Sequence, residues 1–239
     1  MKKNPPYAIV HQDEDILAVN KASGVSVCAD WWNHASPRLD QLLREVFSTS
    51  TALLRVHRID NGCSGLVVFA KNAAAHKRLS LEFESRAVKR TYIAVVHGRT
   101  HWDETECALP LRADGTKDHL TIVDKRRGKP AITQFTRICG APTHSVLSVR
   151  PLTDRQHQIR VHLASLGHPI VCDELYGTAH PLYLSKLKRA WRGDPNEERP
   201  LIARLALHSE TLTIQNLFLE APLHKDIAAL INQLKRIQG

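Results

Sequence analysis

The chain has 239 residues, and its 33 lysines and arginines against 24 aspartates and glutamates leave a formal charge of +9. Charged residues make up 24% and hydrophobic residues 43%, which excludes disordered, collagen-like and coiled-coil classes. We expect no secretory signal, because no apolar segment follows the opening residues, and no run is long enough to cross a bilayer. The excess of positive charge favours a polyanionic partner, since phosphates attract lysine and arginine.

The cysteines are odd in number, widely scattered and never spaced as C-x-x-C, which argues against a disulfide framework and against a cysteine zinc site. This usage fits a reducing compartment, so we expect a cytoplasmic protein. The five positions are Cys28, Cys63, Cys107, Cys139 and Cys172.

Apolar periodicity and turn residues predict the order of helices and strands. The expected elements are a hairpin over 7–19, a helix over 36–46 capped by Ser36, a strand over 66–70, a helix over 72–85 capped by Asn72, a strand over 91–96, a hairpin over 132–150, a helix that Asp154 caps and Gly167 ends, a hairpin over 212–219 and a closing helix over 227–237. Hairpins outnumber strand–helix–strand crossovers, so we expect an α+β fold with a mixed, mostly antiparallel central sheet and peripheral helices. The segment 173–200, rich in proline, glycine and charge, is expected to be a mobile insertion.

A first group of polar residues, 57–65, leads directly into the apolar strand at 66–70. Asp60 lies there beside Arg58 and a glycine-containing turn, where a carboxylate would be desolvated and still exposed to a cleft. Taken by itself, an aspartate in such a turn more often accepts backbone hydrogen bonds.

A second group crowds the start of the helix that Asp154 is expected to cap. Cationic side chains are unfavourable at a helix N-terminus, so an acidic group should meet them. A phosphate or the carboxylate of Asp60 would serve. The residues of this group are Arg155, His157, Gln158, Arg160 and His162.

Three other kinds of site do not fit these residues. His157 and His162 are five positions apart, which is wrong for two zinc ligands on one helical face. His57, Asp60 and Ser64 are too close in sequence to converge as a hydrolase triad, and the serine has no G-x-S-x-G turn. No glycine-rich nucleotide-binding pattern occurs. We therefore expect neither a metal nor a nucleotide cofactor.

In these two segments the chain resembles the RluA family of pseudouridine synthases. The family motif H-R-L-D-x-x-T-S-G is matched by 57–65, and G-R-x-H-Q-I-R-V-H-L-A-x-x-G-H-P-I-x-G-D-x-x-Y-G by 154–177. Shorter motifs match at 20–24, 89–98 and 221–223, in the family's order. The departures from the family pattern are Ala22, Ile59, Cys63, Asp154 and Cys172.

The resemblance implies an enzyme that isomerises a uridine of ribosomal or transfer RNA to pseudouridine without a cofactor. It implies that Asp60 is the catalytic carboxylate and that Arg160 is its basic partner. Tyr92 would stack on the uracil flipped out of the RNA, and Arg58 would fill the space that the base leaves. Flipping costs least where a base is unpaired, so a single-stranded or bulged uridine is the expected target.

The same resemblance implies that residues 1–239 form a single catalytic domain, with an active-site cleft across the sheet and no separate RNA-binding domain. The positive charge must then act on this domain. We expect a monomer, and the residues expected to line or flank the RNA path are Lys89, Arg90, Arg126, Arg127 and Arg155. An RNA-binding module without chemistry, and a carboxylate-based hydrolase of another polyanion, are the alternatives.

Overall fold

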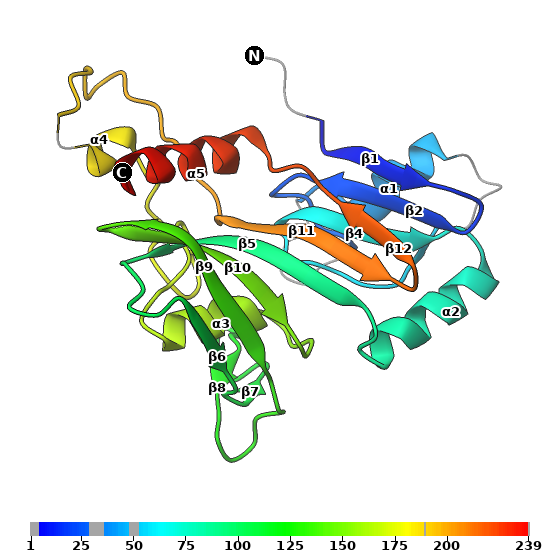
Figure 1. Ribbon diagram of the computed structural model, residues 1–239. Coiled ribbons are helices and arrows are strands. Elements are labelled where there is room, and N and C mark those ends of the chain that lie inside the picture. Colours follow the sequence, from blue (N-terminus) through cyan, green and yellow to red (C-terminus); the bar gives the residue numbers. More distant parts are fainter. Residues whose placement is uncertain (1–4, 29–35, 48–52, 189, 239) are drawn as a thin grey trace. The chain divides into compact units, whose positions relative to one another are not determined.

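The computed structural model describes residues 5–28, 36–47, 53–188 and 190–238 (Figure 1). The chain divides into two compact units. Unit 1 comprises Met1–Thr91 and His208–Leu223, and unit 2 comprises Tyr92–Leu207 and His224–Gly239. The first boundary therefore falls within strand β5 (Lys89–His97).

Unit 1 is built on a sheet whose central strands, β2 and β4, are buried along their whole length. Its strands follow the order β1 (Tyr7–Gln12), β2 (Ile16–Lys21), β4 (Ser64–Ala70), β11 (Leu207–Ile214) and β12 (Leu217–Glu220), with β3 (Leu54–Arg55) also paired to β4. All neighbours are antiparallel except β4 and β11, which run parallel. Helix α2 (Ala73–Glu84) packs beside β3 and β4, and α1 is the helix Leu39–Val46.

The two helices of unit 1 begin in different ways. Asn72 caps α2 as predicted, because its side chain accepts a hydrogen bond from the Ala75 amide at 2.8 Å. The prediction that Ser36 caps α1 is wrong, since the helix begins at Leu39. The segment before it is held instead by Ser26, whose amide bonds the carbonyl of residue 37 and whose carbonyl bonds the amide of residue 39.

Unit 2 contains a second antiparallel group of strands. Their order is β5 (Lys89–His97), β10 (His144–Pro151), β9 (Thr133–Ala141) and β6 (Glu104–Cys107). Helices α3 (Gln158–Ser165) and α5 (Lys225–Gln238) contact β9 and β10, and α4 is the short helix Leu184–Leu187 (Figure 1). Strands β7 (Leu111–Arg112) and β8 (Ile122–Val123) form a separate hairpin. Sequence periodicity does not predict β3, β6, β7, β8 or α4, because these elements are too short to show a period.

Two predictions about the second half of the chain need correction. Helix α3 begins at Gln158, so Asp154 is not its cap; His157 precedes the helix with a left-handed backbone, φ 54°. Gly167 does follow the helix end, with φ +80°. The segment 173–200 does not begin as a loose insertion, because Asp173 is completely buried and Leu182 pairs with Ile202. Burial of a charged group at this point requires partners, and these are described below.

The predicted α+β class and mostly antiparallel pairing are confirmed. Among the described strands, the parallel pairing of β11 beside β4 contributes to the mixed character of the sheet. Among the helices of the described segments, none combines the length and apolar character that a membrane span needs. The cleft across the sheet stays a prediction.

Candidate active site

Buried and more exposed side chains alternate along residues 57–60, the segment that carries Asp60. His57 and Ile59 are buried, whereas Arg58 is exposed and Asp60 is half-buried. A turn then closes at the amide of Cys63, which donates to the Asp60 carbonyl at 3.1 Å. The buried residues thus anchor the segment while the acid and Arg58 lie nearer to solvent.

His57 holds the entry to this turn. Its Nε2 accepts a hydrogen bond from the Val68 amide at 2.9 Å, and its ring stacks on Phe83 with centroids 4.6 Å apart. Burial, with smaller contributions from the charges of Arg90 and Arg55, lowers the pKa of His57 to about 3. The ring is therefore neutral, and from its position just after β3 it accepts a hydrogen bond from β4. The chain can therefore leave the sheet after β3 while the amide of Val68, in a buried strand, keeps a hydrogen-bond acceptor.

The turn itself is fixed by the segment after β2. Lys21 is completely buried, and its ammonium donates to the carbonyls of Ala22, Val25 and Asn61 at 2.9, 2.7 and 3.1 Å. The Ser23 hydroxyl donates to the Gly62 carbonyl at 2.7 Å. The short motif at 20–24 therefore acts as a backbone clamp on the two residues that follow Asp60.

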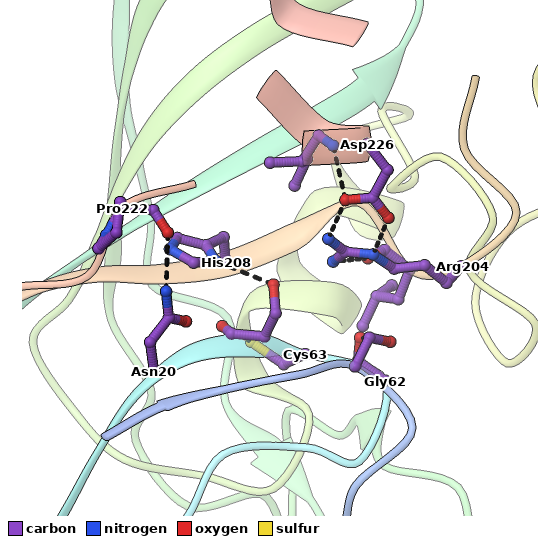
Figure 2. A network of polar contacts seen from close by, with 11 residues as sticks. Asn20, Gly62, Cys63, Arg204, His208, Pro222 and Asp226 are labelled. Atoms are coloured by element: carbon purple, nitrogen blue, oxygen red, sulfur yellow. Dashed lines mark hydrogen bonds and ion pairs between the residues drawn. The ribbon is translucent and has the colours of Figure 1, made fainter. Parts of the chain in front are cut away.

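The far end of the turn is held by a series of polar contacts within unit 1, part of which Figure 2 shows. The Ser64 hydroxyl bonds Nδ1 of His208 at 2.9 Å, and Nε2 of His208 donates to the Ala221 carbonyl at 3.1 Å. Nearby, the side chain of Asn20 donates to the Pro222 carbonyl at 2.8 Å. Ser64 is paired with His208 and is completely buried, so it lacks the access that a hydrolase nucleophile needs.

Replacing Lys21 by methionine is expected to lower the free energy of unfolding by about 3 kcal/mol or more, because three buried or partly buried carbonyls lose a charged donor. The apolar side chain keeps the volume, so the loss isolates the hydrogen bonds. Denaturant unfolding followed by circular dichroism measures it. Lys77→Met, at an exposed position on α2, is the matched control. Equal stability of both variants would contradict the clamp.

In unit 2 the predicted basic partner, Arg160, has a carboxylate that the sequence analysis missed. Its Nε and Nη2 donate to the two oxygens of Asp173 at 2.9 and 2.7 Å. Arg160 is 7% exposed and Asp173 is 0% exposed. Burial alone would raise the pKa of Asp173, but the hydrogen bonds and charge of Arg160 outweigh it and hold the pKa below its usual value. The only available signal was the place of Asp173 in the second motif.

The other polar residues of α3 face a buried network. Gln158 donates to the hydroxyl of Thr133 at 2.9 Å, and Thr133 bonds Nδ1 of His162 at 2.9 Å. His157 bonds the hydroxyl of Tyr176 at 2.8 Å. In the described ranges no group of three or more histidines, cysteines, aspartates or glutamates could hold a metal ion.

Tyr92 lies in β5 opposite Val149 of β10 and is buried. Asp60 and Arg58 belong to unit 1, whereas Tyr92 and Arg160 belong to unit 2. The geometry within each unit therefore accounts for how each of these residues is held.

The predicted RNA-binding cations have different surroundings. Lys89, Arg126 and Arg127 are exposed, and half-buried Arg155 donates from Nε to the Pro130 carbonyl at 3.1 Å. Arg90 is 9% exposed, with its guanidinium 5.9 Å from the Phe83 ring centroid. Arg90 thus packs beside the ring that stacks on His57, and its contact with RNA stays a prediction.

The turn that presents Arg126 and Arg127 is organised by Asp124. Its Oδ1 accepts from both arginine amides, at 3.0 and 2.9 Å, and its Oδ2 accepts from Arg112 at 2.7 Å. The backbone bond from Arg127, then Arg112 and the bond from Arg126, lower the pKa of Asp124 to about 2. One carboxylate thus fixes the turn, and the two arginine side chains extend outward.

Comparison with known proteins identifies the family to which the chain belongs. A family model described as RNA pseudouridylate synthase matches residues 15–165. The chain is 32% identical over 217 residues to the dual-specificity RNA pseudouridine synthase RluA of Yersinia pestis, covering 90% of this chain and 96% of that protein. It is 33% identical to the protein of the same name from Escherichia coli (strain K12), covering 88% and 90%.

Solved structures support the fold. Human RNA Pseudouridylate Synthase Domain Containing 4 superposes with a TM-score of 0.74 at 21% identity, covering 95% of this chain and 92% of that one. Human RNA Pseudouridylate Synthase Domain Containing 1 gives a TM-score of 0.66 at 22% identity and covers 98% of both chains. The length of the sequence match and the agreement in fold lead to one conclusion: this chain belongs to the RluA family of RNA pseudouridine synthases, which isomerise uridine in RNA to pseudouridine.

Proposed function

We propose that this enzyme modifies uridines in ribosomal and transfer RNA and that Asp60 is its catalytic carboxylate. The observation that carries the proposal is the turn around Asp60, in which both following residues are clamped by Lys21 and Ser23 while the acid itself is half-buried. A site holds a reacting group to a fraction of an ångström only when its supports are rigid. The matched relatives are named as dual-specificity enzymes, which supports two RNA classes.

The reaction needs no redox partner and consumes no water. The bond from C1′ to N1 of the base breaks and a bond from C1′ to C5 forms, while N1 gains a hydrogen and C5 loses one. Attack of the carboxylate on the base, attack on the sugar, and removal of the C1′ proton all require Asp60 to be ionised. A cationic partner favours that state, which is the role we assign to Arg160.

Tyr92 and Arg58 are assigned to the flipping of the base. We assign to Tyr92 the stacking contact with the uracil and assistance in the late loss of the C5 proton. Arg58, exposed two residues before the acid, would fill the space that the base leaves in the RNA. Because flipping costs a few kcal/mol in a paired strand, about the strength of one stacked step, an unpaired uridine is the preferred target.

Mapping of pseudouridine tests this function. Purified enzyme is incubated with transcribed ribosomal and transfer RNA, and carbodiimide-dependent stops of reverse transcription locate new pseudouridines. We expect stops at unpaired uridines in both RNA classes. Stops in one class alone would reject the dual target, and their absence from both would reject the function. Release of free uracil would favour the hydrolase instead.

We further propose that Lys89, Arg126, Arg127 and Arg155 contact the RNA backbone. The reaction would take place in the cytoplasm, which suits the five cysteines present as free thiols. The enzyme would act as a monomer with one catalytic domain. The turn organised by Asp124 supports the RNA contact, because it presents two adjacent arginines without using their side chains for its own structure.

Reversal of both charges in this turn, Arg126→Glu with Arg127→Glu, is expected to weaken RNA binding and to reduce its salt dependence. Each lost phosphate contact lowers the slope of log K against log salt by about 0.7 for a single strand, so the pair should lower it by about 1.4. Binding titrations at several salt concentrations measure the slope. The control, Lys235→Glu with Arg236→Glu, reverses two adjacent exposed charges on α5. If both double variants change the slope equally, net charge alone is responsible and the contact is refuted.

A further inference from the structure

The guanidinium of Arg160 lies between two residues that follow α3 in the chain, Asp173 and Tyr176. Asp173 binds the Nε and Nη2 edge in a two-point ion pair, at 2.9 and 2.7 Å. The guanidinium carbon lies 5.1 Å from the centroid of the Tyr176 ring. The carboxylate thus fixes the rotation of the planar group, and the ring covers one of its faces.

Asp173 is itself held in place. Its Oδ1, which accepts from Arg160, also accepts from the amides of Leu175 and Tyr176 at 3.0 and 3.1 Å. The acid is completely buried, so it has little room to change its conformation. A carboxylate that is fixed by the backbone transfers that order to the arginine, whose long side chain would otherwise sample many rotamers.

Tyr176 links the same guanidinium to the β7–β8 hairpin. Its hydroxyl accepts a hydrogen bond from the Thr121 amide at 2.9 Å and bonds Nδ1 of His157 at 2.8 Å. Burial raises the pKa of Tyr176, so the hydroxyl keeps its proton. Tyr176 also packs, with Val123, against a small apolar cluster of Leu111, Ala131 and Val161.

We propose that Asp173 and Tyr176 are positioning residues that hold Arg160 in one orientation and couple that orientation to the β7–β8 hairpin. The inference rests on the proposed function, in which Arg160 supports the ionised catalytic acid. The hairpin leads into the turn of Arg126 and Arg127, because β8 ends at residue 123 and Asp124 begins the turn. RNA held at that turn would therefore meet an arginine that is already oriented.

Asparagine at position 173 keeps the shape but loses the charge and one acceptor oxygen. We expect Asp173→Asn to lower kcat about 100-fold, the effect of misplacing a reacting group by about 1 Å, with an unchanged KM for RNA. Tyr176→Phe keeps the ring and loses both hydroxyl bonds, so its kcat should fall less. Asp173→Glu restores the charge and should recover part of the activity.

A second two-point arginine–carboxylate pair in the same unit, less buried than the first, offers a control. Arg204 donates from Nε and Nη2 to the oxygens of Asp226 at 2.8 and 2.7 Å (Figure 2). Asp226→Asn likewise removes one negative charge from a two-point pair. It should lower the melting temperature and leave kcat unaltered. Equal losses of kcat in Asp173→Asn and Asp226→Asn would refute a specific positioning role.

A double-mutant cycle separates positioning from folding. If Asp173 acts through Arg160, then Asp173→Asn should add little in an Arg160→Lys background, whereas independent effects would multiply. Multiplied effects would overturn the proposal.

Nuclear magnetic resonance of the arginine Nε–H group tests the orientation without any turnover. In the wild-type enzyme Arg160 should give one slowly exchanging signal, and this signal should broaden or exchange rapidly in Asp173→Asn and shift in Tyr176→Phe. A rapidly exchanging signal in the wild type would reject the proposal. Wild-type enzyme that forms no pseudouridine would reject the proposed function instead, so the two failures are distinguishable.

Discussion

Replacement of Asp60 by asparagine is expected to lower kcat at least about 10³-fold, within the range that general acid–base groups contribute. Asparagine has nearly the same shape, but it neither ionises nor attacks carbon. The fold should persist, because the contact that closes the turn uses the Asp60 backbone carbonyl and not its carboxylate. Single-turnover assays of pseudouridine formation measure the loss, and RNA-binding titrations should show unchanged affinity.

The matched control for this variant is Glu14→Gln, which removes one negative charge from an exposed turn of the same unit. It should retain wild-type turnover. Turnover of Asp60→Asn above about a tenth of the wild-type rate would exclude the carboxylate from the chemical step, since such a loss is below the usual contribution of a catalytic acid or base. Retained cellular function in Asp60→Asn would support an RNA-binding module.

Replacement of Gly65 by alanine is expected to cost about 4 kcal/mol or more of unfolding free energy, a size that single substitutions rarely reach. Gly65 has φ +110°, and an added Cβ would overlap the carbonyl of Ser209 and lie 2.6 Å from its backbone nitrogen. The close approach is the pairing of β4 with β11, in which Ser209 lies opposite Gly65. Backbone atoms cannot move aside as a flexible side chain can, so the two strands must separate.

Gly24→Ala separates this clash from backbone strain. Gly24 also has a positive φ, +80°, but an added Cβ would meet nothing within 4 Å. Its cost should be about 1 kcal/mol, the usual price of an L-residue in that region. Denaturant midpoints of the two variants give the comparison. Similar midpoints would show that strain, and not the approach of β11, dominates at Gly65.

The loss of β11 pairing in Gly65→Ala should also reach the active-site turn. Ser64, next to Gly65, bonds His208 of β11, and that bond fixes the far end of the turn. We therefore expect any folded Gly65→Ala enzyme to lose turnover more than RNA affinity. Steady-state kinetics at a temperature where the variant is folded provide the measurement.

Local sequence determined much of the secondary structure. The helix after Asn72, the strand into Ala70 and the hairpin of β9 and β10 were predictable, because a cap, an apolar run and an alternating pattern act between near neighbours. The two long motifs likewise identified the family, since their residue order does not depend on the fold. The local rule failed at Ser36, where backbone contacts with Ser26 replace the expected cap, and at Asp154, where the left-handed backbone of His157 delays the helix start to Gln158.

Tertiary structure alone decided which charged residues are buried and what they meet. Lys21 and Arg90 are residue types that usually lie on the surface. In this fold Lys21 instead clamps the turn of Asp60, and Arg90 packs beside Phe83. Arg160 and Asp173 are 13 positions apart, and no periodic pattern predicts that they meet. The physical reason is that a charge is buried only when folding supplies its partners from several segments, and the sequence near each residue contains only part of that set.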